Sequence, residues 1–234
     1  MPTDTDYVDV TNEPRHPQVF QSETLRAYIC AIPPGATTLY HRHGRDTVYI
    51  VLQGGVLRTR NMNGYRRSPT AFPRSFPIPR RVWLGIQTVL AGASTLRPRT
   101  FFITLSGKRE TIHAVSASDR NPNDVRLMGV EILRDSGAPA TLPSFYRREY
   151  RRNNATVYRL VLGSAEATAE HRLSGPAFFV CLGGTAEIRL SSEPAGSPHR
   201  HTLRPEGFLW TEQAATLSIV NTGSETLEMV VVVP

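Results

Sequence analysis

Two histidines, His41 and His43, stand directly before an apolar, β-branched run in the segment 35–54. Side chains alternate along an extended chain, so residues two apart point to the same face. Two imidazoles on one face can bind one transition-metal ion. The run from Val48 to Leu52 ends at a pair of glycines, which predicts a buried strand followed by a turn. The histidine pair is therefore expected at the end of a β-structure and not on a helix.

The spacing of this segment resembles the first motif of the cupin superfamily, in which a glycine, two histidines, a glutamate and a second glycine follow one another at fixed intervals. The positions in register are Gly35, His41, His43 and Gly54. The glutamate position holds Thr47, which follows Asp46. The resemblance implies an all-β fold built from cupin-type barrels, also described as double-stranded β-helices or jelly rolls.

The second half of the chain repeats the plan of the first. The run from Phe178 to Gly184 echoes Tyr49 to Gly55, and pairs of short apolar strands follow both runs. We therefore expect a bicupin, with an N-terminal barrel over residues 1–134, a Pro-, Gly- and Arg-bearing linker over 135–156, and a C-terminal barrel over 157–234. When Gly183 is aligned with Gly54, Glu170 and Arg172 fall at the two histidine positions, so the second barrel is expected to be degenerate.

A third candidate ligand is His113, because it stands on the strand where the family's second motif places its histidine. The resemblance implies a metal site in the first barrel formed by His41, His43 and His113, with Fe, Zn, Ni or Mn as the ion. Thr is a poor metal ligand, so either the three histidines bind the ion alone or Asp46 reaches into the site, although a residue one step off the motif points away in a regular strand. Thr47 and Tyr49 are the expected ligand-binding residues. The alternative is an emptied pocket in which core hydrogen bonds satisfy His113.

Two classes of function follow from the resemblance. The first is a mononuclear metal-dependent enzyme, dioxygenase-like, acting on a small organic molecule, with Tyr49, Gln53 or Arg58 lining its pocket. The second is a non-catalytic barrel that binds or senses a small ligand, which the missing glutamate and the degenerate second barrel favour. A homodimer is expected from the resemblance alone.

The net charge of +7 does not indicate a nucleic-acid-binding protein, because it comes from one window. Residues 47–109 carry 11 basic residues and no acid, whereas the rest of the chain carries 16 basic and 20 acidic residues. Within this window, the proline-rich segment 65–108 is expected to be the least regular. The absence of a long apolar run or secretory signal and the two isolated cysteines favour a cytoplasmic protein with no membrane partner.

Overall fold

The computed structural model describes residues 6–62, 70–71, 93–106, 110–134, 140–152, 155–192 and 199–234. The chain divides into two compact units, Met1–Leu133 and Arg134–Pro234. Over the described residues the regular structure consists of strands and one 3₁₀ turn, η1 (Val10–Asn12), so the all-β expectation is confirmed. None of the helical structure in the described ranges is long and apolar enough to cross a membrane.

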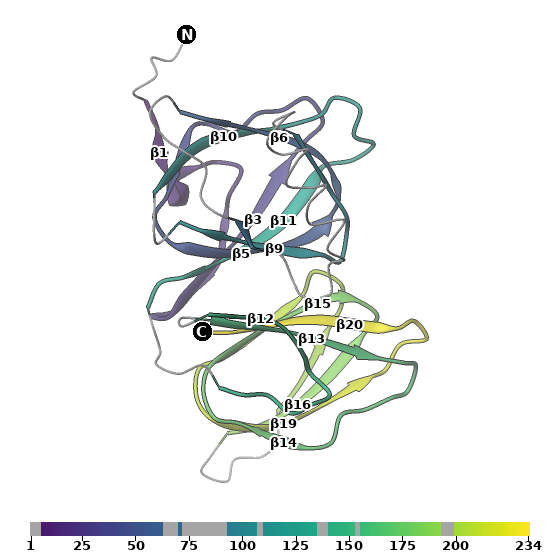
Figure 1. The fold of residues 1–234 in the computed structure, drawn as a ribbon. Coiled ribbons are helices and arrows are strands. Elements are labelled where there is room, and N and C mark those ends of the chain that lie inside the picture. The colour runs from purple at the N-terminus through teal and green to yellow at the C-terminus, as the bar shows by residue number, and fades with distance from the viewer. Residues whose placement is uncertain are drawn as a thin grey trace. The chain divides into compact units, whose positions relative to one another are not determined.

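Two sheets face each other in the first unit (Figure 1). One follows the order β1 (Val8–Asp9), β4 (His41–His43), β10 (Thr111–Ala117), β6 (Gly55–Asn61) and β8 (Ala93–Leu96). The other follows the order β2 (Gln18–Gln21), β3 (Leu25–Ile32), β11 (Val125–Ile132), β5 (Asp46–Gln53), β9 (Phe101–Leu105) and β7 (Thr70–Ala71). The strands that enclose the unit's interior thus come from both ends of its sequence.

The second unit repeats this arrangement. Its first sheet follows the order β12 (Arg147–Arg152), β13 (Ala155–Leu162), β20 (Leu227–Val233), β15 (Ala177–Gly183) and β18 (Phe208–Thr211). Its second sheet follows the order β14 (His171–Leu173), β19 (Ala215–Asn221), β16 (Ala186–Ser192) and β17 (His199–Leu203). Both units are therefore two-sheet jelly-roll barrels, as the sequence predicted.

The linker expected over residues 135–156 needs correction, because β12 and the start of β13 lie inside it and pair with each other. The arginine-rich composition of β12 suggested an exposed connection. Glu149 on this strand is buried, and its carboxylate accepts a hydrogen bond of 2.7 Å from Arg147 and lies 3.8 Å from Arg159. This acidic partner offsets the arginine charge, so the segment forms a sheet edge.

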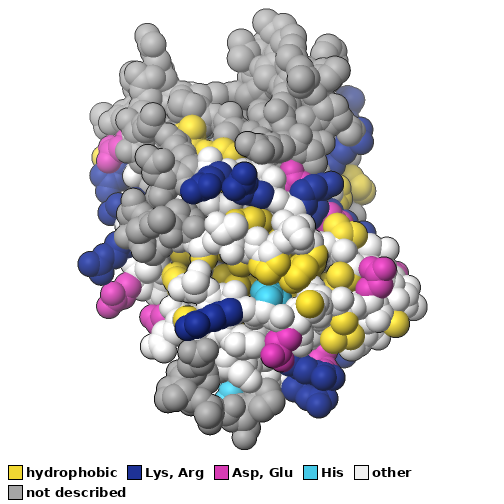
Figure 2. All heavy atoms as spheres, turned by 60° about the horizontal axis from the view of Figure 1, so that its bottom comes forward, with side chains coloured by type: hydrophobic (Ala, Val, Ile, Leu, Met, Phe, Trp, Pro, Cys, Tyr) yellow, Lys and Arg dark blue, Asp and Glu magenta, His cyan; other side chains and the backbone are white. Residues whose placement is uncertain are grey.

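Much of the basic window lies outside the described residues. The expected irregularity of 65–108 does not extend to β8 and β9, which pair with β6 and β5. On the face shown in Figure 2, Lys and Arg side chains lie in separate groups between acidic and hydrophobic side chains. The ion pair between Arg189 and Glu187, at 2.9 Å, is one example of this mixing of charge.

The buried core of the first unit lies against β11, which pairs with β3 on one side and β5 on the other. Gly129 on β11 stands opposite Tyr28 on β3 and Tyr49 on β5, and both tyrosines are buried. A Cβ added at Gly129 would lie 2.4 Å from Cζ of Tyr28, so this position accepts no larger residue without displacing a buried ring.

We predict that Gly129→Ala lowers the free energy of unfolding of the first unit by about 1–3 kcal/mol, because overpacking forces core side chains out of their rotamers. Urea denaturation followed by tyrosine fluorescence measures this. Gly44→Ala is the matched control, since the nearest atom to its added Cβ is Glu110 Oε1 at an ordinary 3.7 Å. Equal stability of the two variants would contradict the packing described here.

Candidate metal centre

Three histidine rings converge in the first unit. β4 and β10 pair antiparallel in a register that places His41 opposite His113, with His43 two residues further along β4. The ring centroids lie 4.9 Å apart for His41 and His43, 4.8 Å for His41 and His113, and 5.0 Å for His43 and His113. One nitrogen from each ring lies within 4.8 Å of the others. The three histidines singled out in the sequence therefore form one cluster.

The register that turns His113 toward the pair is fixed just beyond it. Thr38 and Val115 form a reciprocal pair, in which the Thr38 amide donates to the Val115 carbonyl and the Val115 amide donates to the Thr38 hydroxyl, each at 2.9 Å. The hydroxyls of Thr37 and Ser116 bond to each other at 2.9 Å. A slip of one residue would turn His113 to the other face, and these bonds oppose it.

His41 is held in one tautomer. Its Nδ1 lies 2.9 Å from the carbonyl oxygen of Leu39, which can only accept a hydrogen, so Nδ1 carries the proton and Nε2 has a free lone pair. The side chain is fully buried, and Nε2 finds no hydrogen-bond partner in the described part of the chain. Burial lowers the pKa of His41 to about 3. The ring therefore stays neutral and offers an unused donor atom, as a metal ligand must.

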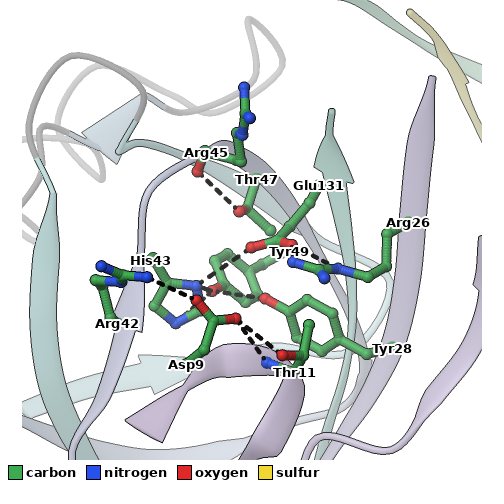
Figure 3. Close-up of polar contacts among 10 residues, drawn as sticks. All are labelled: Asp9, Thr11, Arg26, Tyr28, Arg42, His43, Arg45, Thr47, Tyr49 and Glu131. Atoms are coloured by element: carbon green, nitrogen blue, oxygen red, sulfur yellow. Dashed lines mark hydrogen bonds and ion pairs between the residues drawn. The ribbon is translucent and has the colours of Figure 1, made fainter. Parts of the chain in front are cut away.

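His43 faces a buried carboxylate that the sequence analysis did not select. Nδ1 of His43 lies 3.6 Å from Oε1 of Glu131, whose other oxygen accepts a 2.9 Å hydrogen bond from Nε of Arg26 (Figure 3). Both His43 and Glu131 are buried. Although burial opposes ionisation, the neighbouring His43 ring and the charge of Arg26 hold the pKa of Glu131 below its ordinary value.

The two expected ligand-binding residues lie beside this group. Thr47 is fully buried, and its hydroxyl donates to the Arg45 carbonyl at 3.2 Å. The hydroxyl of Tyr28 donates to that of Tyr49 at 3.0 Å, and the Tyr49 oxygen lies 3.4 Å from Nε2 of His43. Figure 3 shows Tyr49 between His43 and Tyr28.

The other candidate side chains fit the site less well. Arg58 is exposed on β6, which does not suit a pocket-lining residue. Gln53 is half-buried at the end of β5, at a register shift opposite β11. Asp46 is half-buried and lies one residue before Thr47 on β5, where the strand period turns it to the opposite face.

His16 is a further residue that the sequence analysis did not select, and it lies in the N-terminal arm, residues 6–17, which precedes β2. Its ring is buried, and the ring centroid lies 4.7 Å from that of His41 and 5.3 Å from that of Tyr28. The arm is tied down because the Arg15 carbonyl accepts a 3.1 Å hydrogen bond from the Ala31 amide. Burial lowers the pKa of His16 to about 2, and proximity to His41 adds to the effect. Nothing in the composition of the arm signals this burial.

The second unit contains the same framework with different side chains. β14 pairs with β19 so that His171 stands opposite Leu217, as His41 stands opposite His113. Nδ1 of His171 lies 2.9 Å from the carbonyl oxygen of Ala169, which repeats the contact of His41 with Leu39. Leu173 then occupies the place of His43.

The alignment of Gly183 with Gly54 is therefore wrong by one residue. The ladders match Gly184 to Gly54, so His171 and Leu173, and not Glu170 and Arg172, take the two histidine positions. The cause is that the two glycine pairs are offset by one residue: Gly183 matches Gln53, and Gly184 matches Gly54. The second pair of histidines two residues apart, His199 and His201, lies on β17.

The same alignment of the two units shows that polar residues of the first unit's site are replaced in the second unit, mostly by apolar ones. Ala177 replaces Thr47, Phe179 replaces Tyr49, and Val233 replaces Glu131, because β20 runs beside β15 as β11 runs beside β5. Thr156 stands opposite Val233, where Arg26 stands opposite Glu131. The fold thus forms with apolar residues at most of these positions. The buried polar group of the first unit is not a requirement of the fold, which favours a functional role.

We predict that acid destabilises the first unit of EDTA-treated protein in part through His16 and His41. Histidine in the unfolded chain has a pKa near 6.5. Below that pH the unfolded chain therefore binds protons at these two positions, whereas the buried rings of the native protein stay neutral. Stability should therefore fall between pH 6 and 5 by about 1.4 kcal/mol per pH unit for each such histidine. Urea midpoints over this range measure the slope. His16→Leu should reduce it, the exposed His199→Leu should not, and equal slopes in all three proteins would contradict the burial of His16.

No protein-family model matches the sequence, and no curated protein sequence matches it. Several solved structures match most of the chain. AerE from Microcystis aeruginosa matches with a TM-score of 0.57 at 9% identity, over 94% of this chain and 97% of its own.

A cupin 2 conserved barrel domain protein from Leptotrichia buccalis matches with a TM-score of 0.53 at 10% identity, over 92% of this chain and 86% of its own. The oxalate decarboxylase of Lactobacillus farciminis, solved as a formate complex, matches with a TM-score of 0.55 at 9% identity, over 91% of this chain and 77% of its own. At these identities the likeness concerns the fold, and together with the two jelly-roll units it shows that the chain has the tandem-barrel fold of a bicupin.

Proposed function

We propose that the chain is a metal-binding bicupin whose first barrel holds one divalent transition-metal ion through His41, His43 and His113. The observation that carries the proposal is the convergence of three rings, one of which, His41, has a buried Nε2 with no hydrogen-bond partner among the described residues. An unsatisfied buried acceptor is costly, at about 1–3 kcal/mol. A bound ion would satisfy it.

The donor set fits such an ion. Three nitrogens bound to one ion at about 2.0–2.2 Å lie no more than about 4.4 Å apart. The observed nitrogens lie within 4.8 Å of one another, so small side-chain rotations bring them to one centre. Imidazole suits Fe, Zn, Ni and Mn to different degrees, and the donors alone do not select among these metals.

The proposed activity is that of a mononuclear metal-dependent enzyme, dioxygenase-like, acting on a small organic molecule. A divalent ion held by three neutral imidazoles has coordination positions open and supplies Lewis-acid or redox chemistry. The chain's own residues shape the site: Leu39 fixes the tautomer of His41, and Tyr49 presents a hydroxyl beside His43. Thr47, with its hydroxyl bonded to Arg45, lines the site next to the histidines.

The second candidate function is non-catalytic binding or sensing of a small ligand. The observation that favours it is Thr47 at the glutamate position of the motif, which leaves the motif without its carboxylate. Oxygen uptake by metal-loaded protein over a panel of small organic acids separates the two candidates. Turnover that is lost in His113→Leu supports the enzyme, and saturable binding without turnover supports the sensor.

The remaining elements of the proposal concern partners and location. We propose a homodimer that works in the cytoplasm on a small-molecule ligand or substrate, without nucleic-acid or membrane partners. Light scattering of the purified chain tests the dimer.

We predict that protein purified without a histidine tag carries about one equivalent of metal, which His43→Leu and His113→Leu remove. These variants copy Leu173 and Leu217 at the matching positions of the second barrel, so the fold should tolerate them. Elemental analysis after loading and desalting measures the metal. His171→Leu is the control and should retain it. A wild-type chain that retains no metal from a stoichiometric mixture of these ions, or a His113→Leu variant that binds as well as wild type, would contradict the proposal.

A further inference from the structure

We propose that Glu131, held by Arg26, supplies a carboxylate beside the metal site, whose first motif lacks one. In this proposal Glu131 is a positioning residue: it accepts the hydrogen of His43 Nδ1 and so presents Nε2 of His43 to the ion. The inference rests on the proposed metal site and adds a residue that the motif does not contain.

The unsatisfied oxygen of Glu131 is the first observation. Arg26 approaches Oε2 with two of its nitrogens, through a 2.9 Å bond from Nε and a closer contact from Nη2. Oε1 is buried and makes no hydrogen bond within the described ranges. Nδ1 of His43 lies 3.6 Å from it, one small rotation from a hydrogen bond. A buried carboxylate oxygen requires a donor, and His43 Nδ1–H is placed to be that donor.

The ladder explains why a carboxylate can move from one strand to the next. Glu131 stands directly opposite Thr47 on β5 and opposite Arg26 on β3. Opposed residues share one face of a sheet, with Cβ atoms about 4.5–5.5 Å apart. The carboxylate of Glu131 therefore lies on the same face of the sheet as Thr47, the residue at the motif's glutamate position. It extends from the neighbouring strand, β11, and not from β5. From β11 the carboxylate approaches Nδ1 of His43, as Figure 3 shows.

The tyrosine pair contacts both nitrogens of His43. The hydroxyl of Tyr28 donates to the oxygen of Tyr49, so the hydrogen of Tyr49 is directed elsewhere. The Tyr49 oxygen lies 3.4 Å from Nε2 and 3.5 Å from Nδ1 of His43, so it accommodates either tautomer and the Glu131 carboxylate selects between them. His41 and His43 would then share one arrangement, in which an oxygen fixes the hydrogen on Nδ1 and Nε2 is free to bind. Such outer partners orient metal-binding histidines and raise their basicity.

The second unit has an uncharged pair at the positions that match Glu131 and Arg26. Val233 and Thr156 stand opposite each other where Glu131 and Arg26 stand in the first unit, and Leu173 takes the place of His43. Where the second histidine is absent, the carboxylate and its arginine are absent too. This joint replacement is expected if Glu131 serves His43, and it supplies a substitution that the fold already accepts.

The first test uses metal-free protein, so it does not depend on metal binding. Two-bond ¹H–¹⁵N correlation spectra of the imidazoles should show His43 protonated at Nδ1. The double variant Arg26→Thr/Glu131→Val copies the second unit and leaves no unpaired arginine. In it His43 should lose this single tautomer. In Glu131→Gln the one amide oxygen must accept from Arg26, so the amide N–H faces His43 and should shift the hydrogen of His43 to Nε2. Protonation of His43 at Nε2 in the wild type, or an unchanged tautomer in the double variant, would overturn the proposal.

The second test measures Zn²⁺ affinity by competition with a chromophoric chelator. Loss of an outer-shell partner typically lowers metal affinity 10–100-fold, and we expect that loss both in the double variant and in Glu131→Gln. Glu228→Gln, which removes the charge that pairs with Arg159 in the second unit, is the control and should leave the Zn²⁺ affinity unchanged. Wild-type protein that binds no Zn²⁺ but shows the Nδ1–H tautomer would refute the metal site and leave the role of Glu131 in orienting His43 supported.

Discussion

The pairing of β4 with β10 is the constraint on which the account of this protein depends. It places His41 opposite His113, and the bonds between Thr38 and Val115 hold that register. Side chains alternate along a strand, so a shift of one residue would remove His113 from the cluster while leaving the sheet intact. The proposed metal site is thus a property of register, and in the proposal Leu39 and Glu131 determine which nitrogen each ring of β4 can offer.

The two barrels form an internal comparison within one chain. Both units place a strand with a histidine at its start against a long central strand, and both hold that histidine through the carbonyl two residues before it. Only the first unit adds the second and third histidines and the buried carboxylate. In the second, Leu173, Leu217 and Val233 take those places within an apolar core. Burying polar groups is unfavourable unless they are satisfied. The concentration of these groups in one barrel therefore supports the proposal that the first unit carries the functional site.

Much of the fold and part of the site could be predicted from the sequence. The strand period and flanking glycines identified His41 and His43, and the strand around His113 supplied the third ring. Glu131 could have been found as the one acid in a largely apolar strand, had its opposition to Thr47 been visible. Strand pairing is a long-range property, and the glycine pairs of the two units are offset by one residue, which is why the second barrel was misaligned. His16 reaches the site through backbone bonds of an arm that has no periodic pattern.

X-ray absorption spectroscopy of protein loaded with one equivalent of metal tests the central claim most directly, since it reports the donor atoms around the ion. The account predicts a shell that contains three imidazole nitrogens at about 2.0–2.2 Å, with the multiple-scattering pattern of histidine, and a shell with two imidazoles in His113→Leu. A shell with one imidazole or none, or a shell of three imidazoles that is unchanged in His113→Leu, would contradict it.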